Sequence, residues 1–346
     1  MRASPGRLVW NGLADMRVGV TGVGRIGRPH AERLAANPDV SAVVLHDINA
    51  TLASAVAADL DMQAVADLDA LLSSVDALVI AAITTAHADL LSAAVEARVP
   101  VMCEKPISHD LERARKIVCR VHALNVPVLM GFQRRFDAGY QAARDLVASG
   151  GLGTLYTFRT VGHDPEPASE SYIAGSGGLF RDFGVHDFDA LRFVTNQEIA
   201  RVYADATVRA FAVYERYDDA DTAVATLTLA DGALGLASYT RHDPLGYDVR
   251  MELFGSRDSV VVGWDDQAPL RTLEPNGPPL HPTPHATFHD RFADAYAAEI
   301  STFLDVARGR LSSPSTVDDA LEALRVAVAC NLSLRERRPV DLSEIP

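Results

Sequence analysis

Cysteine is scarce in this chain, with only three residues in 346. Cys103, Cys119 and Cys330 are widely spaced and form no C-x-x-C pair. The sequence therefore indicates neither a disulfide framework nor a zinc site built from thiolates. We expect a protein of the reducing cytoplasm.

Positive charge is also in short supply, because 32 Lys and Arg face 46 Asp and Glu, for a formal net charge of −14. This balance argues against nucleic acid or an anionic membrane as a partner. No apolar run reaches the ~18 residues of a membrane span. The apolar patch near the start, residues 8–10, is too short for a signal peptide, so residues 1–15 are expected to be an N-terminal extension.

What the chain does have is length for two domains, each with its own core, since it holds 346 residues of which 48% are hydrophobic. The first domain is predicted at residues 16–132 and the second at residues 133–346.

The first domain opens with a short apolar strand that runs into a G-x-G-x-x-G turn at Gly22, Gly24 and Gly27. The first glycine allows a tight turn, the second lets backbone approach a pyrophosphate, and the third lets the next helix pack on the strand. The helix expected from Arg25 would aim its free N–H groups at the phosphates. A second apolar run ends at Asp47, where a dinucleotide fold places the acid that binds the adenosine ribose hydroxyls.

Apolar strands alternate with helical stretches as far as Phe132, as expected of a parallel sheet covered on both faces. The predicted strands lie near residues 17–21, 41–47, 62–65, 76–82, 99–103 and 127–131. Thr84 and His87 follow the fourth strand, and Glu104 and Lys105 follow the fifth, at the edge where such sheets bind ligands. His87 could equally have a structural role at the helix start. Charges at the end of a buried strand are costly unless they are used or paired.

The pattern changes after Phe132, because alternating strands dominate from Thr154 onward, near residues 154–162, 200–214, 222–230, 233–241, 247–254 and 258–263. Their direct succession through short turns predicts antiparallel pairing and an α+β domain with a large sheet. A long excursion from His163 to Asn196 carries Asp182, His186 and Asp189, which share one face if the stretch is helical. A histidine beside carboxylates is how a general base is held and tuned. Terminal helices are expected at residues 288–309 and 316–335.

A metal centre is not predicted. Three histidines, His281, His285 and His289, are close in sequence, but intervening prolines keep the first two off one helix face. No carboxylate completes an obvious ligand set.

Taken together, the motifs make the chain resemble the glucose-fructose oxidoreductase and inositol 2-dehydrogenase family from about Met16 to Leu342. The motifs that carry the resemblance are the glycine turn of Gly22 to Gly27, Asp47, Thr84 with His87, Cys103 to Pro106, Gly131-Phe132, Arg134 to Asp137, Gly178 to Asp182 and His186 to Asp189. Within the family, the Arg-Arg-Phe-Asp and His-Asp-Phe-Asp segments look most like inositol 2-dehydrogenases.

The resemblance implies an N-terminal Rossmann domain that binds NAD, a C-terminal domain with an open, mostly antiparallel sheet, and a site between them. It implies that Lys105, Asp182 and His186 are catalytic, and that the bond between Lys105 and Pro106 is cis. The expected cofactor-binding residues are Gly22, Gly24, Arg25, Ile26, Gly27, Asp47, Ile48, Thr84, His87, Glu104 and Gln133. The expected substrate residues are Arg135, Asp189, His163, Tyr247 and Tyr296.

Two departures from the family pattern stand out. Ile83 replaces the proline usual before the threonine that follows the fourth strand, and His163-Asp164-Pro165 replaces the His-Arg-Asn segment of typical inositol enzymes. The second change removes two polar side chains expected near the substrate.

The function expected from the resemblance is NAD-dependent oxidation of a secondary alcohol of a cyclic polyol or sugar, an inositol first, by a homotetramer. Two alternatives stay open. One is an enzyme of the same family that acts on an aldose, an anhydrosugar or a keto-sugar, and the other is a non-catalytic dinucleotide-sensing regulator.

Overall fold

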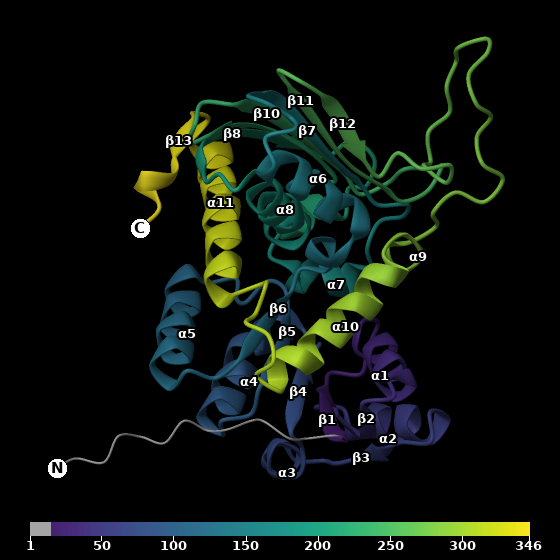
Figure 1. Cartoon of the computed structure of the whole chain (residues 1–346), viewed down its shortest axis with the longest axis vertical. Coiled ribbons are helices and arrows are strands. Elements are labelled where there is room, and N and C mark those ends of the chain that lie inside the picture. The colour runs from purple at the N-terminus through teal and green to yellow at the C-terminus, as the bar shows by residue number, and fades with distance from the viewer. Residues whose placement is uncertain (1–14) are drawn as a thin grey trace. The chain divides into compact units, whose positions relative to one another are not determined.

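Internal contacts group the chain into two units (Figure 1). The first runs up to Gly131 and includes Ala297–Asp318, and the second comprises Phe132–Tyr296 and Asp319–Pro346. The computed structural model describes residues 15–346, so the expected N-terminal extension lies outside the described residues apart from Asp15. The predicted break after residue 132 differs by one residue from the division at Gly131, but Ala297–Asp318 group with the first unit.

The first unit is built on a parallel sheet in the order β3-β2-β1-β4-β5-β6. Its strands are β1 (Met16–Thr21), β2 (Val40–His46), β3 (Gln63–Ala64), β4 (Ala77–Ile80), β5 (Val101–Glu104) and β6 (Val128–Gly131). The helices between them are α1 (Gly27–Ala36), α2 (Ala50–Asp59), α3 (Leu68–Ser74), α4 (Thr84–Glu96) and α5 (Leu111–Leu124). Every residue of β4, β5 and β6 is buried, as expected of strands covered on both faces.

The direction of strand addition reverses beside β1, because β2 and β3 extend the sheet on one side and β4 to β6 on the other. In open parallel sheets, ligands bind at the carboxyl ends of the strands where this reversal occurs. The glycine turn that leaves β1 lies at this point.

The second unit contains a seven-stranded sheet in the order β12-β11-β7-β10-β9-β8-β13. Its strands are β7 (Leu155–His163), β8 (Ile199–Thr207), β9 (Thr222–Leu229), β10 (Leu234–Thr240), β11 (Asp248–Gly255), β12 (Ser259–Val262) and β13 (Val340–Asp341). The pairing is antiparallel throughout except between β7 and β10, which run parallel. The expected open, mostly antiparallel sheet is therefore confirmed.

One strand prediction was too long, since β8 ends at Thr207 instead of residue 214. The carboxylate of Asp221 accepts hydrogen bonds from the backbone N–H groups of Arg209, Ala210 and Phe211 at 2.7–2.9 Å. These bonds turn the chain away from the sheet before the short helix η3 (Tyr214–Tyr217).

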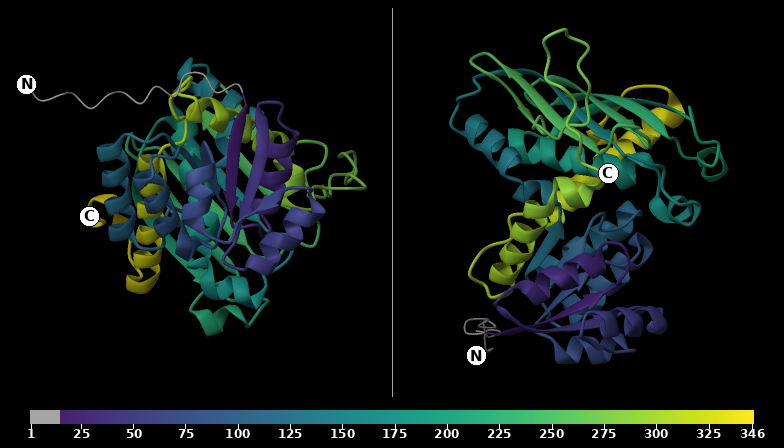
Figure 2. Two further views of the ribbon diagram at one scale, coloured as in Figure 1. Left: turned by 90° about the horizontal axis from the view of Figure 1, so that it is seen from below. Right: turned by 90° about the vertical axis from the view of Figure 1, so that its right-hand side faces the viewer.

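Helices cover one face of the second sheet, as Figure 2 shows, and its other face carries the exposed side chains of the strands. The helices of this unit and the connecting segments are η1 (Gln133–Phe136), α6 (Ala138–Ala148), α7 (Glu170–Ser176), η2 (Phe180–Gly184), α8 (Val185–Thr195), α9 (Phe288–Arg291), α10 (Ala293–Ala307), α11 (Val317–Glu336) and η4 (Leu342–Glu344). Among the helices of the described chain, none is both long and apolar enough to cross a membrane.

Candidate active site

The glycine turn at the end of β1 has two glycines that the protein's own packing requires. Gly22 has φ of +85°, and a Cβ there would lie 2.5 Å from the backbone of Ala82. A Cβ on Gly27 would lie 1.7 Å from the carbonyl oxygen of Gly22. At Gly24, by contrast, a Cβ would meet no described atom within 4 Å. Close approach of a ligand therefore explains the second glycine better than packing does, which fits a pyrophosphate.

Helix α1 begins without a side-chain cap, and so does α4. The other three helices between strands of the first unit, α2, α3 and α5, are capped by Asn49, Asp67 and Asp110. An uncapped N-terminus leaves backbone N–H groups available to an anion, and the helix dipole favours negative charge there. The two uncapped helices follow β1 and β4, the strands at the reversal point, while the exposed Arg25 and the partly exposed Ile26 lie just before α1.

The carboxylate of Asp47 is fixed at the end of β2 by two backbone donors. Val23 N donates to Asp47 Oδ2 at 2.9 Å, and Asn49 N donates to Asp47 Oδ1 at 2.8 Å. The acid is thereby tied to the glycine turn through Val23. Ile48 and Ile83, which follow β2 and β4, are among the most exposed large apolar side chains described and could contact the flat face of a base.

Thr84 opens helix α4, and His87 in its first turn is buried. The two ring nitrogens of His87 lie 2.8 Å from the carbonyl oxygen of Pro106 and 3.0 Å from that of Ala82. Burial lowers the pKa of His87, although both carbonyls oppose this shift. These contacts give His87 a structural role between the end of β4 and the segment after β5.

Lys105 follows β5 directly, is partly exposed, and is joined to Pro106 by a cis peptide bond, as expected. The preceding Glu104 is buried, and its Oε1 accepts a hydrogen bond from His30 Nε2 of helix α1 at 2.7 Å. Burial opposes ionisation of Glu104, but the hydrogen bond and charge of His30 and the charge of Lys105 together lower its pKa. The Glu104 side chain, which we expect to contact the cofactor, is therefore hydrogen-bonded to His30 within the first unit.

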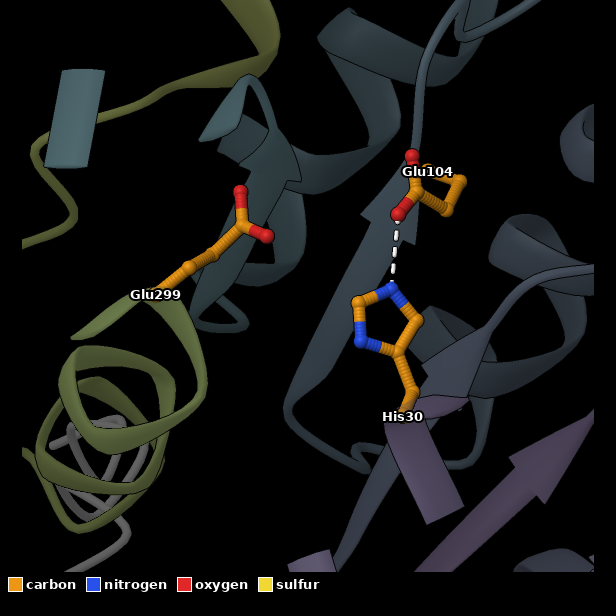
Figure 3. Close-up of side chains that lie close together, drawn as sticks. All are labelled: His30, Glu104 and Glu299. Carbon is orange, nitrogen blue, oxygen red and sulfur yellow. Dashed lines mark hydrogen bonds and ion pairs between the residues drawn. The ribbon is translucent and has the colours of Figure 1, made fainter. Parts of the chain in front are cut away.

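A third acid, Glu299, points toward the His30–Glu104 pair from helix α10 (Figure 3). Glu299 is fully buried, and neither of its carboxylate oxygens has a hydrogen-bond partner among the described residues. Burial and the nearby charge of Glu104 raise the pKa of Glu299 well above its usual value, with Arg33 opposing. This environment therefore favours the neutral carboxylic acid form of Glu299.

The three side chains could geometrically approach one cation, since one ligand atom from each lies within 4.8 Å of the others. However, a zinc site needs each nitrogen or oxygen about 2.0–2.2 Å from the ion. The direct bond of His30 to Glu104 places an imidazole N–H between those two groups. A neutral Glu299 beside a hydrogen-bonded pair accounts for the cluster without a metal.

In the second unit, the segment after β6 carries two buried arginines that pair with helix α8. Arg134 Nη1 lies 2.6 Å from Asp187 Oδ1. Arg135 makes a bidentate pair with Asp189, at 2.8 Å from Nε and 2.6 Å from Nη2, and also contacts Asp319 at 3.0 Å. Arg135 and Asp189, both expected to line the substrate site, thus hold one another.

Asp182 and His186 lie on consecutive helices, Asp182 in the π-helical turn η2 and His186 at the start of α8. Asp182 Oδ1 accepts a hydrogen bond from the Tyr172 hydroxyl at 2.7 Å, and Asp182 Oδ2 lies 2.9 Å from Nη2 of Arg241. The His186 ring packs edge-on against Phe132, with ring centroids 6.3 Å apart. Asp182 is thus a carboxylate held on both oxygens, four residues before a histidine that could serve as a proton acceptor.

The remaining expected residues also belong to the second unit. His163 ends β7, with Nδ1 3.7 Å from Asp243 and 3.9 Å from Asp248. Burial lowers the pKa of His163, while the two acids oppose the shift. Tyr247 and Tyr296 are both buried and both pack against Phe288. Gln133 is buried in η1.

Sequence reasoning missed Arg241 and Tyr172, the two partners of Asp182. Arg241 lies 59 residues after Asp182, and only the fold brings it there. A signal was present all the same, because Arg241 directly follows strand β10 and a buried arginine needs an acidic partner.

In comparisons with known proteins, each of the two parts of the chain matches a family model. Residues 16–132 match the oxidoreductase family with an NAD-binding Rossmann fold, and residues 140–261 match the GFO/IDH/MocA C-terminal domain. Myo-inositol dehydrogenase Hyg17 of Streptomyces leeuwenhoekii is 36% identical over 323 residues, which are 92% of this chain and 97% of that protein. Myo-inositol 2-dehydrogenase of Thermotoga maritima is 32% identical over 342 residues, 95% of this chain and 99% of that protein.

A solved structure of scyllo-inositol dehydrogenase from Lactobacillus casei, with bound NAD(H) and scyllo-inositol, superposes with a TM-score of 0.86. Its sequence is 25% identical, and the match covers 95% of this chain and 99% of that one.

Proposed function

The chain belongs to the GFO/IDH/MocA family of NAD-binding oxidoreductases, and from that membership we propose that it oxidises a secondary alcohol of a cyclic polyol, an inositol in the first instance. It is an NAD-dependent dehydrogenase acting on CH–OH groups. The proposal of an inositol is supported by the relatives named above, whose names include myo-inositol and scyllo-inositol dehydrogenases.

The observation that carries the cofactor assignment is the contrast within the glycine turn. Packing requires Gly22 and Gly27, whereas Gly24 is open to a ligand at the uncapped start of α1. The pyrophosphate of NAD would lie there, with Asp47 toward the ribose hydroxyls. Arg25, Ile26, Ile48, Thr84, His87, Glu104 and Gln133 are the further proposed cofactor residues.

In the proposed reaction, His186 accepts the proton of the alcohol. Lys105 donates a hydrogen bond to the same oxygen and stabilises the negative charge that develops on it. Asp182, as a fixed anion, orients one or both of His186 and Lys105. Bound NAD supplies the acceptor for the hydride that leaves the carbon. Arg135, Asp189, His163, Tyr247 and Tyr296 are the proposed substrate residues.

A second candidate is a family enzyme that acts on another sugar, such as an aldose, an anhydrosugar or a keto-sugar. The segment after β7 favours it, because Asp164 is engaged with Arg241 and Pro165 has no polar side chain, where the family resemblance led us to expect Arg and Asn.

The assembly we propose is a homotetramer formed through the exposed face of the second sheet. That face carries the exposed apolar side chains Tyr156, Tyr203, Val224, Leu234, Leu236 and Val261. Apolar groups gathered on one face are typical of a protein interface. We place the protein in the cytoplasm, since Cys103, Cys119 and Cys330 are all free thiols.

NAD reduction across a panel tests the function. The panel contains myo-, scyllo- and D-chiro-inositol, glucose, xylose and 1,5-anhydroglucitol, with NADH formation as the readout. We expect the highest kcat/KM with an inositol. A higher value with an aldose or the anhydrosugar would select the second candidate, and no reduction with any compound would count against both.

A further inference from the structure

Arg241 is a buried cation in the second unit that has two acidic partners. It follows the last residue of β10, and only 3% of its surface is exposed. Its Nη2 lies 2.9 Å from Asp182 Oδ2, and its Nη1 lies 3.2 Å from Asp164 Oδ2. The backbone N–H of Arg241 donates to the carbonyl oxygen of Asp221 at 2.8 Å, which fixes the start of the side chain. The guanidinium therefore bridges two acids from a rigid position.

The two acids come from different elements, and their situations differ. Asp182 belongs to the π-helical turn η2, and its other oxygen accepts the Tyr172 hydroxyl at 2.7 Å, so both oxygens are held. Asp164 follows the end of β7 and is more exposed than Asp182. A buried carboxylate with a guanidinium on one oxygen and a hydroxyl on the other is favoured in its ionised form and has little freedom to rotate.

Two further titratable groups interact with Arg241, and one of them, Asp219, is an acid. Asp219 and the Tyr214 hydroxyl both interact electrostatically with the guanidinium. Asp219 Oδ1 already accepts the backbone N–H groups of Leu179 and Ala220, each at 2.8 Å. Arg241 is thus one cation set against Asp164, Asp182 and Asp219.

We propose that Arg241 is a positioning residue for the proposed reaction. Arg241 holds Asp182, which lies four residues before His186, in its ionised form and in a fixed orientation. Asp164 partly neutralises Arg241 and so determines how much of the positive charge of Arg241 acts on Asp182 and His186. This inference rests on the proposed function, because it assigns a task to the catalytic Asp182.

Two substitutions should move the acid limb of the pH–activity profile in opposite directions. Arg241→Met removes a cation, so protonation of Asp182 and His186 becomes easier and the limb moves to higher pH, by about one unit. Asp164→Asn removes an anion and leaves the Asp182 contact in place, so the limb moves to lower pH by a smaller amount. A role confined to folding would move the limb in neither variant.

The experiment measures kcat, KM and the dissociation constant of NAD against pH, using the full-length enzyme and the best substrate of the panel. Arg241→Met should lower kcat about tenfold or more with little change in NAD affinity. Arg241→Lys should recover part of this loss, because an ammonium keeps the charge but lacks the planar fork that reaches two acids.

A double-mutant cycle with Asp182→Asn adds a second test. If Arg241 acts through Asp182, Arg241→Met should cost little further kcat once Asp182 is an amide. The matched control is Arg308→Met in the first unit, where an equally buried arginine pairs with Asp39 at 2.7 Å. It should lower thermal stability and leave the pH profile in place.

The results of these experiments distinguish the role of Arg241 from the proposed function. An active parent enzyme whose acid limb stays fixed in the Arg241 and Asp164 variants, with additive losses in the cycle, would overturn the role of Arg241 alone. If Arg241→Met does not fold, Asp164→Asn decides by the direction of the limb and Arg241→Lys by a partial loss of kcat. A parent enzyme that reduces NAD with no compound would overturn the proposed function and this inference with it.

Discussion

Three arginine–aspartate pairs hold buried charge in the second unit: Arg134 with Asp187, Arg135 with Asp189, and Arg241 with Asp182. Removing one partner of such a pair leaves an uncompensated buried charge, which is strongly destabilising. The sequence predicts a site at Asp182 and His186 from their types and spacing, which are local information, and the family resemblance adds Arg135. It could not predict that Arg135 and Asp189 bind each other across 54 residues, because that contact depends on how the segment after β6 meets α8.

Glu299 provides a prediction on stability. Its pKa is raised by burial, so the folded protein keeps a proton that the unfolded chain releases near the ordinary carboxyl pKa of about 4.3. This contribution is fully present below that pH and is lost as pH rises toward the folded pKa. Glu299→Gln keeps the shape of the neutral acid without a titrating proton. Relative to the parent, the variant should therefore gain stability with rising pH, by up to about 1.4 kcal/mol per pH unit inside that window.

The measurement is urea unfolding of parent and variant at several pH values from about 5 to 8. Glu32→Gln, which changes an exposed acid on α1, is the control and should give a flat difference. A flat difference for Glu299→Gln as well would show that Glu299 is ionised in the folded protein.

The position of Asp47 leads to a prediction on cofactor choice. Its carboxylate would accept from the ribose hydroxyls and repel a 2′-phosphate, and no basic residue occurs in the following Ile48 to Thr51. The parent enzyme should prefer NAD over NADP, and Asp47→Ala should narrow the ratio of the two kcat/KM values. Equal kcat/KM with both cofactors in the parent would refute this role.

At the scale of elements, the glycines of the turn between β1 and α1 have different roles, because some are required by packing and one is open to a ligand. Gly24→Ala should leave the unfolding free energy unchanged, because the new methyl group meets open space, but should weaken NAD binding about tenfold or more. Gly27→Ala should instead destabilise the first unit by about 1–3 kcal/mol or more, because its methyl group would clash with Gly22. Calorimetric NAD binding and urea unfolding check both variants. Unchanged NAD affinity in a folded Gly24→Ala protein would place the pyrophosphate elsewhere.

Elements of the parallel sheet were predictable because a strand buried on both faces is a continuous apolar run, as β4 is. The end of β8 was not predictable. The turn there depends on hydrogen bonds to the carboxylate of Asp221, which lies beyond the turn in sequence. The parallel pairing of β7 with β10 also escaped prediction, since hydrophobic alternation fixes which face a residue takes but not which strand lies beside it.

For the whole molecule, the exposed face of the second sheet leads to a prediction about the number of chains in the assembly. Light scattering of the parent should give about four times the chain mass of 37.2 kDa. Leu236→Glu places a charge at the middle of the exposed face and should reduce that mass. Leu273→Glu, at an even more exposed position outside the strands, is the control and should leave the mass unchanged. A parent mass of one chain at micromolar concentration would exclude the tetramer.

The account rests most directly on His186 as the base of an NAD-dependent alcohol oxidation, with Lys105 acting on the same oxygen. The decisive measurement is the turnover of His186→Ala, Lys105→Ala and the double variant under saturating substrate, alongside their NAD dissociation constants. We expect each single variant to lose ~10²–10⁴ in kcat while binding NAD as the parent does, because the charge on the alcohol oxygen changes only during the reaction. The double variant should lose less than the product of the two, and parent activity should fall at low pH as His186 becomes protonated. Near-normal turnover of a folded His186→Ala enzyme would contradict the account.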